Sequence, residues 1–241
     1  MVRFGVALIL MIVPIFPLMA VEPHFIVLPG IEGPSPLARG VVSGLRSTHP
    51  SASFEIFDWT TGHAYRMLYH LRDWNRNQIM VDRLAERIVS LQKSQPDQPI
   101  VLIGHSGGAA LIVLALEKLP KEVQVQQAIL LAPDLSPNYP LNTALDRTAY
   151  GIDVFHSRFD FLIQGIATRA VGTIDRVHTR GAGMVGFRTA QEWDENSRFL
   201  NSYKLRQHDY EMAMALSGHF GGHFTYGMPE FVKRYISPVL R

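Results

Sequence analysis

The segment from residue 99 to 111 constrains the fold of this chain more than any other. It reads PIVLIGHSGGAAL, in which a short β-branched run ends at Gly104 and a helix-compatible apolar segment begins at Ala109. The G-x-S-x-G pattern therefore lies between a predicted buried strand and a predicted helix. A turn this sharp strains the backbone of Ser106, so its neighbours must be nearly free of side chains, as Gly104 and Gly108 are. We expect a strand–turn–helix unit centred on Ser106.

Composition favours a globular domain and excludes several classes of site. The 241 residues are 47% hydrophobic and 18% charged, which argues against disorder and suits one α/β domain. The formal charge of +2 and the lack of a dense basic run make nucleic acid an unexpected partner. There are no cysteines, which excludes disulfides, a thiolate nucleophile, a zinc–cysteine site and a lipidated cysteine.

The N-terminus has the layout of an export signal. Arg3 precedes an uncharged apolar run from Phe4 to Val21. We predict that residues 1–21 are a cleaved signal peptide or an uncleaved membrane anchor, and that residues 22–241 form the folded domain. The alternative is a buried first strand or helix. We expect an exported protein, secreted or periplasmic, that meets a membrane only through this segment.

Strand patterns alternate with helix patterns along the rest of the chain, which predicts parallel strands joined by helical crossovers. We expect an α/β fold with a mostly parallel sheet of about six strands and helices on both faces. The predicted strands are His24–Leu28, Ser53–Trp59, Ile100–Ile103, Val125–Leu131, Ile152–His156 and Tyr203–Gln207. The predicted helices are Leu37–Leu45, Asn77–Gln95, whose apolar face includes Ile79, Leu84, Ile88 and Leu91, and Gly107–Leu119.

One stretch, residues 165–201, is too long for an ordinary connection in such a fold. It contains five glycines among the apolar residues Met184, Phe187 and Trp193. Long insertions of this kind are often lids or binding loops. We interpret it either as a lid or as an excursion packed on the body, and the apolar residues suggest an acyl or otherwise apolar substrate.

A serine hydroxyl becomes a good nucleophile only beside a base, and that base needs an anionic partner. Asp160 lies just past a predicted strand end, and His223 lies in a glycine-rich loop after the last predicted strand. Because the carboxyl ends of parallel strands meet at one edge of the sheet, we expect both to converge on Ser106. Asp134 after the preceding strand is the alternative acid, and His219 is the alternative histidine.

The oxyanion formed by attack on an acyl group needs two preorganised N–H donors. We expect one from Gly107 at the helix N-terminus, where the helix dipole helps. The second should come from the loop after the first strand, where Pro29-Gly30 precedes Ile31, the favoured donor.

His219 and His223 are four residues apart, but the intervening glycines oppose a helix and there is no H-E-x-x-H glutamate. We therefore expect neither a metal nor an organic cofactor.

With these motifs, the chain resembles the α/β-hydrolase superfamily, and in particular its small esterase- or lipase-like members. The resemblance runs from about His24 to the C-terminus and is most specific at residues 101–109 and at the Ser157-x-x-Asp160 corner. Little chain precedes the oxyanion loop, so the implied fold is a minimal α/β-hydrolase of about six strands. In that family the serine, the acid and the histidine follow one another in this order.

The resemblance implies a serine hydrolase that cleaves small-molecule carboxylic esters, with Ser106 as nucleophile, His223 as base and Asp160 as its partner. An acyltransferase or a thioesterase would use the same three residues. A non-catalytic binding protein on the same fold is a further alternative, because fold does not dictate function. The physiological substrate and the oligomeric state do not follow from the sequence.

Overall fold

The computed structural model describes residues 21–188 and 203–241. Nearly all of the predicted leader and the segment that contains Trp193 lie outside the described residues, so the export signal and the lid stay predictions there. Among the described helices, none combines the length and the apolar character needed to cross a membrane.

Six parallel strands form one sheet with the order β2-β1-β3-β4-β5-β6. The predicted sheet and fold class are therefore confirmed. The strand order places the strand that leads to Ser106 at the centre of the sheet, between β1 and β4. The strands are β1 His24–Leu28, β2 Ser53–Ile56, β3 Ile100–His105, β4 Gln127–Leu131, β5 Ile152–His156 and β6 Leu205–Asp209.

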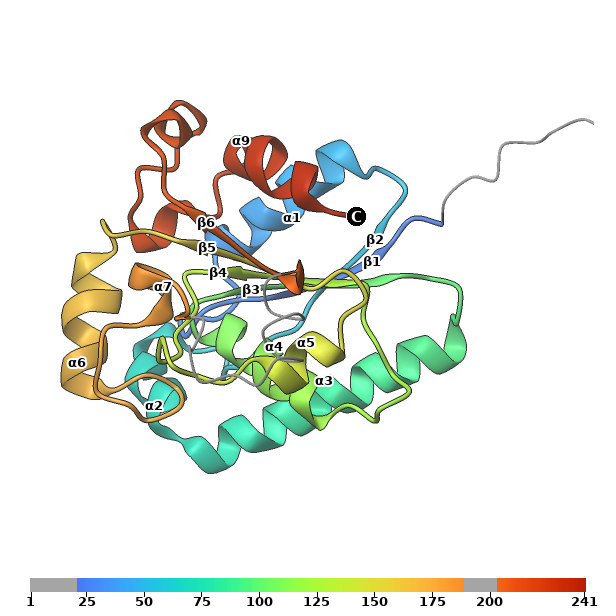
Figure 1. Cartoon of the computed structure of the whole chain (residues 1–241), viewed down its shortest axis with the longest axis horizontal. Coiled ribbons are helices and arrows are strands. Elements are labelled where there is room, and N and C mark those ends of the chain that lie inside the picture. The colour runs from blue at the N-terminus through green and yellow to red at the C-terminus, as the bar shows by residue number, and fades with distance from the viewer. Residues whose placement is uncertain (1–20, 189–202) are drawn as a thin grey trace, which may run out of the picture.

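Helices cover both faces of the sheet: α1 and α9 lie on one side, and α3, α4 and α5 lie on the other (Figure 1). The short helices α6 and α7 follow β5 in the chain. The bounds are α1 Pro36–Thr48, α2 Met67–Arg72, α3 Trp74–Ser94, α4 Gly107–Lys118, α5 Asn142–Asp146, α6 Thr168–Val171, α7 Ala182–Val185 and α9 Pro229–Phe231. Segments of 3₁₀ or π helix span Ala64–Arg66, Phe161–Ala167, Met212–Ser217, His223–Thr225, Val232–Ile236 and Ser237–Val239.

The central strands β3 and β4 are buried along their whole length and mostly apolar, because both faces of the sheet are covered. In β3, Leu102 packs into the core under α3 and α4, whereas Val101 and Ile103 pack into the core under α1 and α9. The same period of two runs through β1, where Ile26 and Phe25 face opposite sides. Burial on both faces thus fixes the register of the strands that carry the site.

Besides two-residue shifts in the start of β4 and in both bounds of β6, two expectations from the sequence are wrong. The second strand ends at Ile56 rather than at Trp59, because the Trp59 indole turns into the protein and donates its N–H to the carbonyl of Pro29 at 2.7 Å. The second error concerns α3, where Leu84 and Ile88 are buried but Ile79 is 54% exposed. The apolar face of α3 is narrower than its sequence suggests.

Leu102 and Ile79 make a matched test of this packing. Leu102→Ala removes a fully buried side chain from the central strand, and we expect it to lower the free energy of unfolding by about 2–5 kcal/mol. Ile79→Ala, at an exposed position, should change that free energy by less than about 0.5 kcal/mol. Urea unfolding of both variants measures the difference. Equal losses would show that the assignment of the buried faces is wrong.

Candidate active site

Ser106 occupies the sharp turn between β3 and α4, with φ 53° and ψ −119°. Its backbone N–H donates to the carbonyl of Leu131 at 2.9 Å, and its own carbonyl accepts the N–H of Asp134 at 3.2 Å. Neither neighbouring glycine has room for a side chain: a Cβ on Gly104 would lie 2.6 Å from the Ala109 Cα, and one on Gly108 would lie 2.7 Å from the Leu28 carbonyl. The strained turn that the G-x-S-x-G pattern predicts is therefore present.

The structure brings Ser106, His223 and Asp160 together, although 117 residues separate the serine from the histidine. The Nδ1 of His223 lies 2.5 Å from Oδ2 of Asp160, and its Nε2 lies 3.0 Å from Oγ of Ser106. All three side chains are buried. Since a carboxylate only accepts, Nδ1 carries the proton, which leaves the Nε2 lone pair facing the serine hydroxyl.

Both partners of Ser106 come from loops at the carboxyl ends of strands. Asp160 follows β5 and caps the helical turn Phe161–Ala167, where it accepts the backbone N–H of Gln164 at 3.4 Å. His223 follows β6 and begins the turn His223–Thr225. Burial lowers the pKa of His223, and the hydrogen bond to Asp160 only partly opposes this. The histidine is therefore held neutral at pH 7, as a proton acceptor must be.

The loop after β1 lies against the start of α4. A Cβ on Gly107 would be 3.2 Å from Cγ2 of Ile31, so the two predicted oxyanion donors belong to neighbouring backbone segments. Two side chains that sequence reasoning missed hold this loop: Trp59 donates to the Pro29 carbonyl, and Nδ1 of His70 lies 2.8 Å from the carbonyl of Ile31. No spacing in the sequence links Trp59 or His70 to this loop.

Residues 57–234, more than half of the chain, match the family model described as serine aminopeptidase, S33. The chain is a member of this family of α/β hydrolases. A hydrolase of the alpha/beta superfamily from Xanthomonas campestris pv. campestris aligns at a TM-score of 0.50 and 16% identity, over 90% of this chain and 99% of that one. The dienelactone hydrolase from Anabaena variabilis aligns at a TM-score of 0.53 and 15% identity, over 91% and 86%.

Esterase PE8 aligns at a TM-score of 0.55 and 12% identity, over 92% of this chain and 94% of that one. Identities this low show a shared fold. No curated protein sequence matches the chain. The resemblance to α/β hydrolases that the motifs indicate is thus confirmed at the level of family and fold.

The alternative acid and the alternative histidine of this hydrolase have other surroundings. Asp134 is buried, and Oδ1 of its carboxyl has no hydrogen-bond partner among the described residues. Burial, together with the charges of Asp175 and Asp160, raises the pKa of Asp134 to about 8. His219 has its Nδ1 2.7 Å from Oγ1 of Thr225, so this ring nitrogen is occupied outside the Ser106 site.

The described part of the predicted insertion packs on the body of the hydrolase. In α7, the N–H groups of Ala182 and Gly183 donate to the carbonyls of Leu135 at 2.7 Å and Pro133 at 2.9 Å. Met184 and Phe187 are buried, so they do not offer an open apolar surface to a substrate, contrary to the expectation from sequence. Trp193 lies outside the described residues.

Exposed aromatic side chains instead flank the residues that hold Ser106. Phe159 and Phe161 adjoin Asp160, and Phe220 and Phe224 lie on either side of His223; we call these four residues the apolar rim. The two loops meet, since a Cβ on Gly221 would be 3.1 Å from the Phe159 Cβ. Four large exposed aromatic residues beside a buried polar cluster mark a surface that an apolar ligand can cover.

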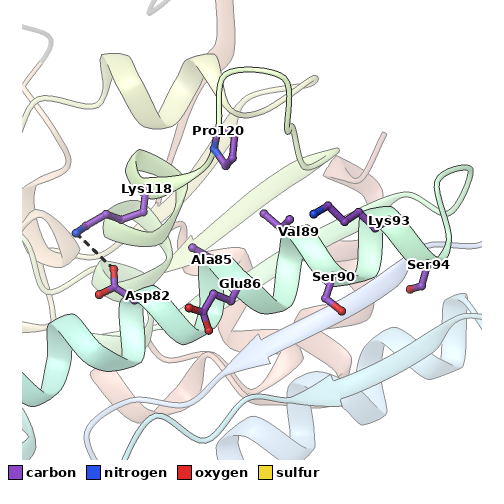
Figure 2. A pocket seen from close by; sticks show the side chains of 9 residues that line it. All are labelled: Asp82, Ala85, Glu86, Val89, Ser90, Lys93, Ser94, Lys118 and Pro120. Atoms are coloured by element: carbon purple, nitrogen blue, oxygen red, sulfur yellow. Dashed lines mark ion pairs between the residues drawn. The ribbon is translucent and has the colours of Figure 1, made fainter.

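A groove of about 890 Å³ lies elsewhere, along α3 and the end of α4 (Figure 2). Its wall includes an exposed ion pair in which Nζ of Lys118 is 3.4 Å from Oδ1 of Asp82. Ser106, Asp160 and His223 do not line it. The groove has no part in the site described above.

His219 gives the folded hydrolase a pH dependence that can be measured. Its ring packs 4.3 Å from the Tyr226 ring and 4.4 Å from the Phe231 ring, and burial lowers its pKa to about 4. An unfolded histidine titrates near 6.5, so the unfolded state binds the additional proton between these values. We expect the stability from this group to be lost as the pH falls from about 6.5 to about 4, by on the order of 3 kcal/mol.

His219→Phe keeps an aromatic ring at this position and removes the titration. Urea unfolding between pH 7 and pH 4.5 should give a curve of free energy against pH that is flatter than that of the native protein by about one proton. His156 and His223, whose pKa values are also lowered, add the same slope to both proteins. Parallel curves would contradict the assignment.

Proposed function

We propose that this protein is a serine hydrolase that cleaves carboxylic esters through an acyl-enzyme on Ser106. The observation that carries the proposal is the continuous hydrogen-bond chain from Asp160 through His223 to Ser106, with distances of 2.5 and 3.0 Å. Each atom in this chain has the proton state that the chemistry needs: an acceptor carboxylate, a neutral imidazole with its proton on Nδ1, and a hydroxyl that donates to Nε2.

The reaction has two halves. Oγ of Ser106 attacks the ester carbonyl carbon while Nε2 of His223 takes the hydroxyl proton, and Asp160 stabilises the imidazolium that forms. As the tetrahedral intermediate collapses, the C–O bond to the alcohol breaks and Nε2 returns the proton to the leaving oxygen. Water then attacks the acyl-enzyme with the same base, the acid is released and Ser106 regains its proton.

The charge that develops on the carbonyl oxygen needs fixed donors. The N–H of Gly107 lies at the start of α4, a twelve-residue helix whose dipole favours negative charge there. Ile31, whose side chain adjoins Gly107, supplies the second N–H. Each such donor contributes about 2.7–4 kcal/mol to lowering the barrier. Because both donors are backbone groups, side-chain substitutions at these positions test them poorly.

The apolar rim supports an apolar acyl group as the substrate. Phe220 is 66% exposed, and burying an aromatic side chain of this kind against an acyl chain would be favourable by about 25 cal/mol for each Å² removed from water.

The family description also names an aminopeptidase, which would cleave an amide by the same acyl-enzyme route. The acceptor of the acyl group, whether water or another nucleophile, distinguishes a hydrolase from an acyltransferase.

The role of Ser106 can be tested with a fluorophosphonate probe, which reacts covalently with an activated serine. We expect the native protein to be labelled, and expect Ser106→Ala to lose both labelling and ester turnover, the latter by about 10⁴- to 10⁶-fold. His223→Ala should lose turnover to a similar extent, whereas His219→Ala should keep most of it. Ser90→Ala, at an exposed position on α3, is the matched control.

A folded native protein that takes up no probe would refute the proposed function. Turnover that survives His223→Ala but not His219→Ala would move the role of base to His219.

The substrate class can be tested with p-nitrophenyl esters of increasing chain length and with an aminoacyl p-nitroanilide. We expect turnover of the esters and little or none of the anilide. The double variant Phe161→Ser/Phe220→Ser should lower kcat/KM for the octanoate about tenfold while leaving the acetate within twofold, because only the longer chain reaches the rim. Ile79→Ser, also exposed but on α3, is the control. Equal losses for both esters would exclude the rim as an acyl-binding surface.

A further inference from the structure

We propose that Glu32 and His105 form a buried positioning pair that ties the oxyanion loop to the backbone of His223. The inference rests on the proposed function and assigns two residues that this function does not itself use. His105 is the last residue of β3, directly before Ser106, and Glu32 directly follows Ile31. Each therefore adjoins a residue already assigned a role.

His105 makes its contact with His223 through the ring nitrogen Nε2. This atom lies 2.9 Å from the backbone carbonyl oxygen of His223. A carbonyl only accepts, so Nε2 carries a proton. The ring of His105 is almost fully buried, and its centroid lies 4.7 Å from that of the His223 ring. The contact thus joins β3 to the short turn that begins with His223.

The other nitrogen of His105 faces a carboxylate. Its Nδ1 lies 3.7 Å from Oε1 of Glu32. At this distance the contact is electrostatic, and Nδ1 has no hydrogen-bond partner among the described residues. Burial opposes ionisation of Glu32, but the contact with His105 leaves the pKa of its carboxyl below the ordinary value. Glu32 is therefore charged at neutral pH, and its Oε1 faces the buried Nδ1 of His105.

Glu32 also holds the loop that precedes it. Its Oε1 lies 3.3 Å from the backbone N–H of Gly30 and 3.3 Å from the hydroxyl of Ser35, which both donate to it. A Cβ on Gly30 would collide with the Glu32 carboxylate and would lie 2.9 Å from Nδ1 of His105. The glycine at position 30 therefore makes room for the pair. Ile31, the proposed oxyanion donor, lies between Gly30 and Glu32, which the hydrogen bond from the Gly30 N–H joins.

His223 needs such an anchor because of the loop that carries it. Gly218 and Gly221 both have positive φ values, of 85° and 78°, and Gly222 directly precedes the histidine. Glycines restrict the backbone weakly, so the loop alone defines the position of His223 poorly. A hydrogen bond from the strand that bears Ser106 fixes the distance between the base and its nucleophile, to which rate is sensitive.

The test compares variants at both positions. His105→Leu removes both the hydrogen bond to His223 and the contact with Glu32, and we expect kcat for a p-nitrophenyl ester to fall about 10- to 100-fold with KM within twofold. His105→Gln places an amide N–H near the position of Nε2 and should recover most of kcat. Glu32→Gln should lower kcat to an intermediate degree. The double variant Glu32→Gln/His105→Leu should be no slower than His105→Leu alone, because the two residues act as one unit.

Asp153→Asn is the matched control, because Asp153 is a buried carboxylate paired with a histidine away from Ser106. Its Oδ1 lies 2.8 Å from Nε2 of His208, near the opposite end of β5. We expect this variant to lower stability and leave kcat unchanged. If His105→Leu and Glu32→Gln behave in the same way, with lower stability and kcat within twofold, the pair is merely structural and the inference is wrong.

A second measurement separates this inference from the proposed function. The proton on Nδ1 of His223, held against Asp160, gives a downfield NMR resonance in a folded protein whether or not an ester is turned over. We expect His105→Leu to abolish or shift this resonance and Asp153→Asn to leave it in place. A native protein without esterase activity that shows this pattern would refute the function and keep the pair, whereas a resonance unchanged in His105→Leu would refute the pair.

Discussion

The backbone of Ser106 is the constraint on which the rest of the site depends. A non-glycine residue at φ 53° costs on the order of 1–3 kcal/mol and persists only where the surroundings over-determine it. Here the serine N–H is bonded to β4 through Leu131, and its carbonyl accepts the N–H groups of Asp134 at 3.2 Å and Ala110 at 3.2 Å. Hydrogen bonds to β4, to the segment that follows it and to the first turn of α4 thus hold the strained backbone of Ser106 in place.

The parallel sheet brings the other residues of the candidate site to the same edge as Ser106. Since every strand runs in the same direction, the loops after β1, β3, β5 and β6 all leave from one edge. The oxyanion loop, the serine, Asp160 and His223 each belong to one of these loops. Chain separation therefore matters little: Asp160 and His223 are 63 positions apart, with all of α6, α7 and β6 between them, yet their side chains lie in hydrogen-bond contact.

Sequence patterns predict the part of this arrangement that periodicity and chain order encode. Apolar runs locate the buried strands β1, β3, β4 and β5, and glycine spacing locates the turn at Ser106. The polar strand β6 lies two residues later than expected. The side-chain contacts within the site depend on residues far apart in the chain, and a single sequence does not show which of them meet. Trp59 lies beyond the end of β2, where its indole donates to the Pro29 carbonyl. The sequence shows only that His105 precedes the serine, whereas the structure shows its contacts with Glu32 and His223. Asp134 and Asp160 follow adjacent strands, so order alone cannot rank them, whereas the 2.5 Å contact with His223 does.

The buried carboxyl groups around the serine show why one acid is paired and another is not. Asp160 and Glu32 each face a histidine, so each negative charge is offset within a poorly solvated region. Asp134 has no such partner, and with a pKa of about 8 it is neutral at pH 7. A second charge there would repel that of Asp160, which stabilises the imidazolium in the reaction that we propose. Burial therefore favours the neutral form of Asp134 beside the contact between Asp160 and His223.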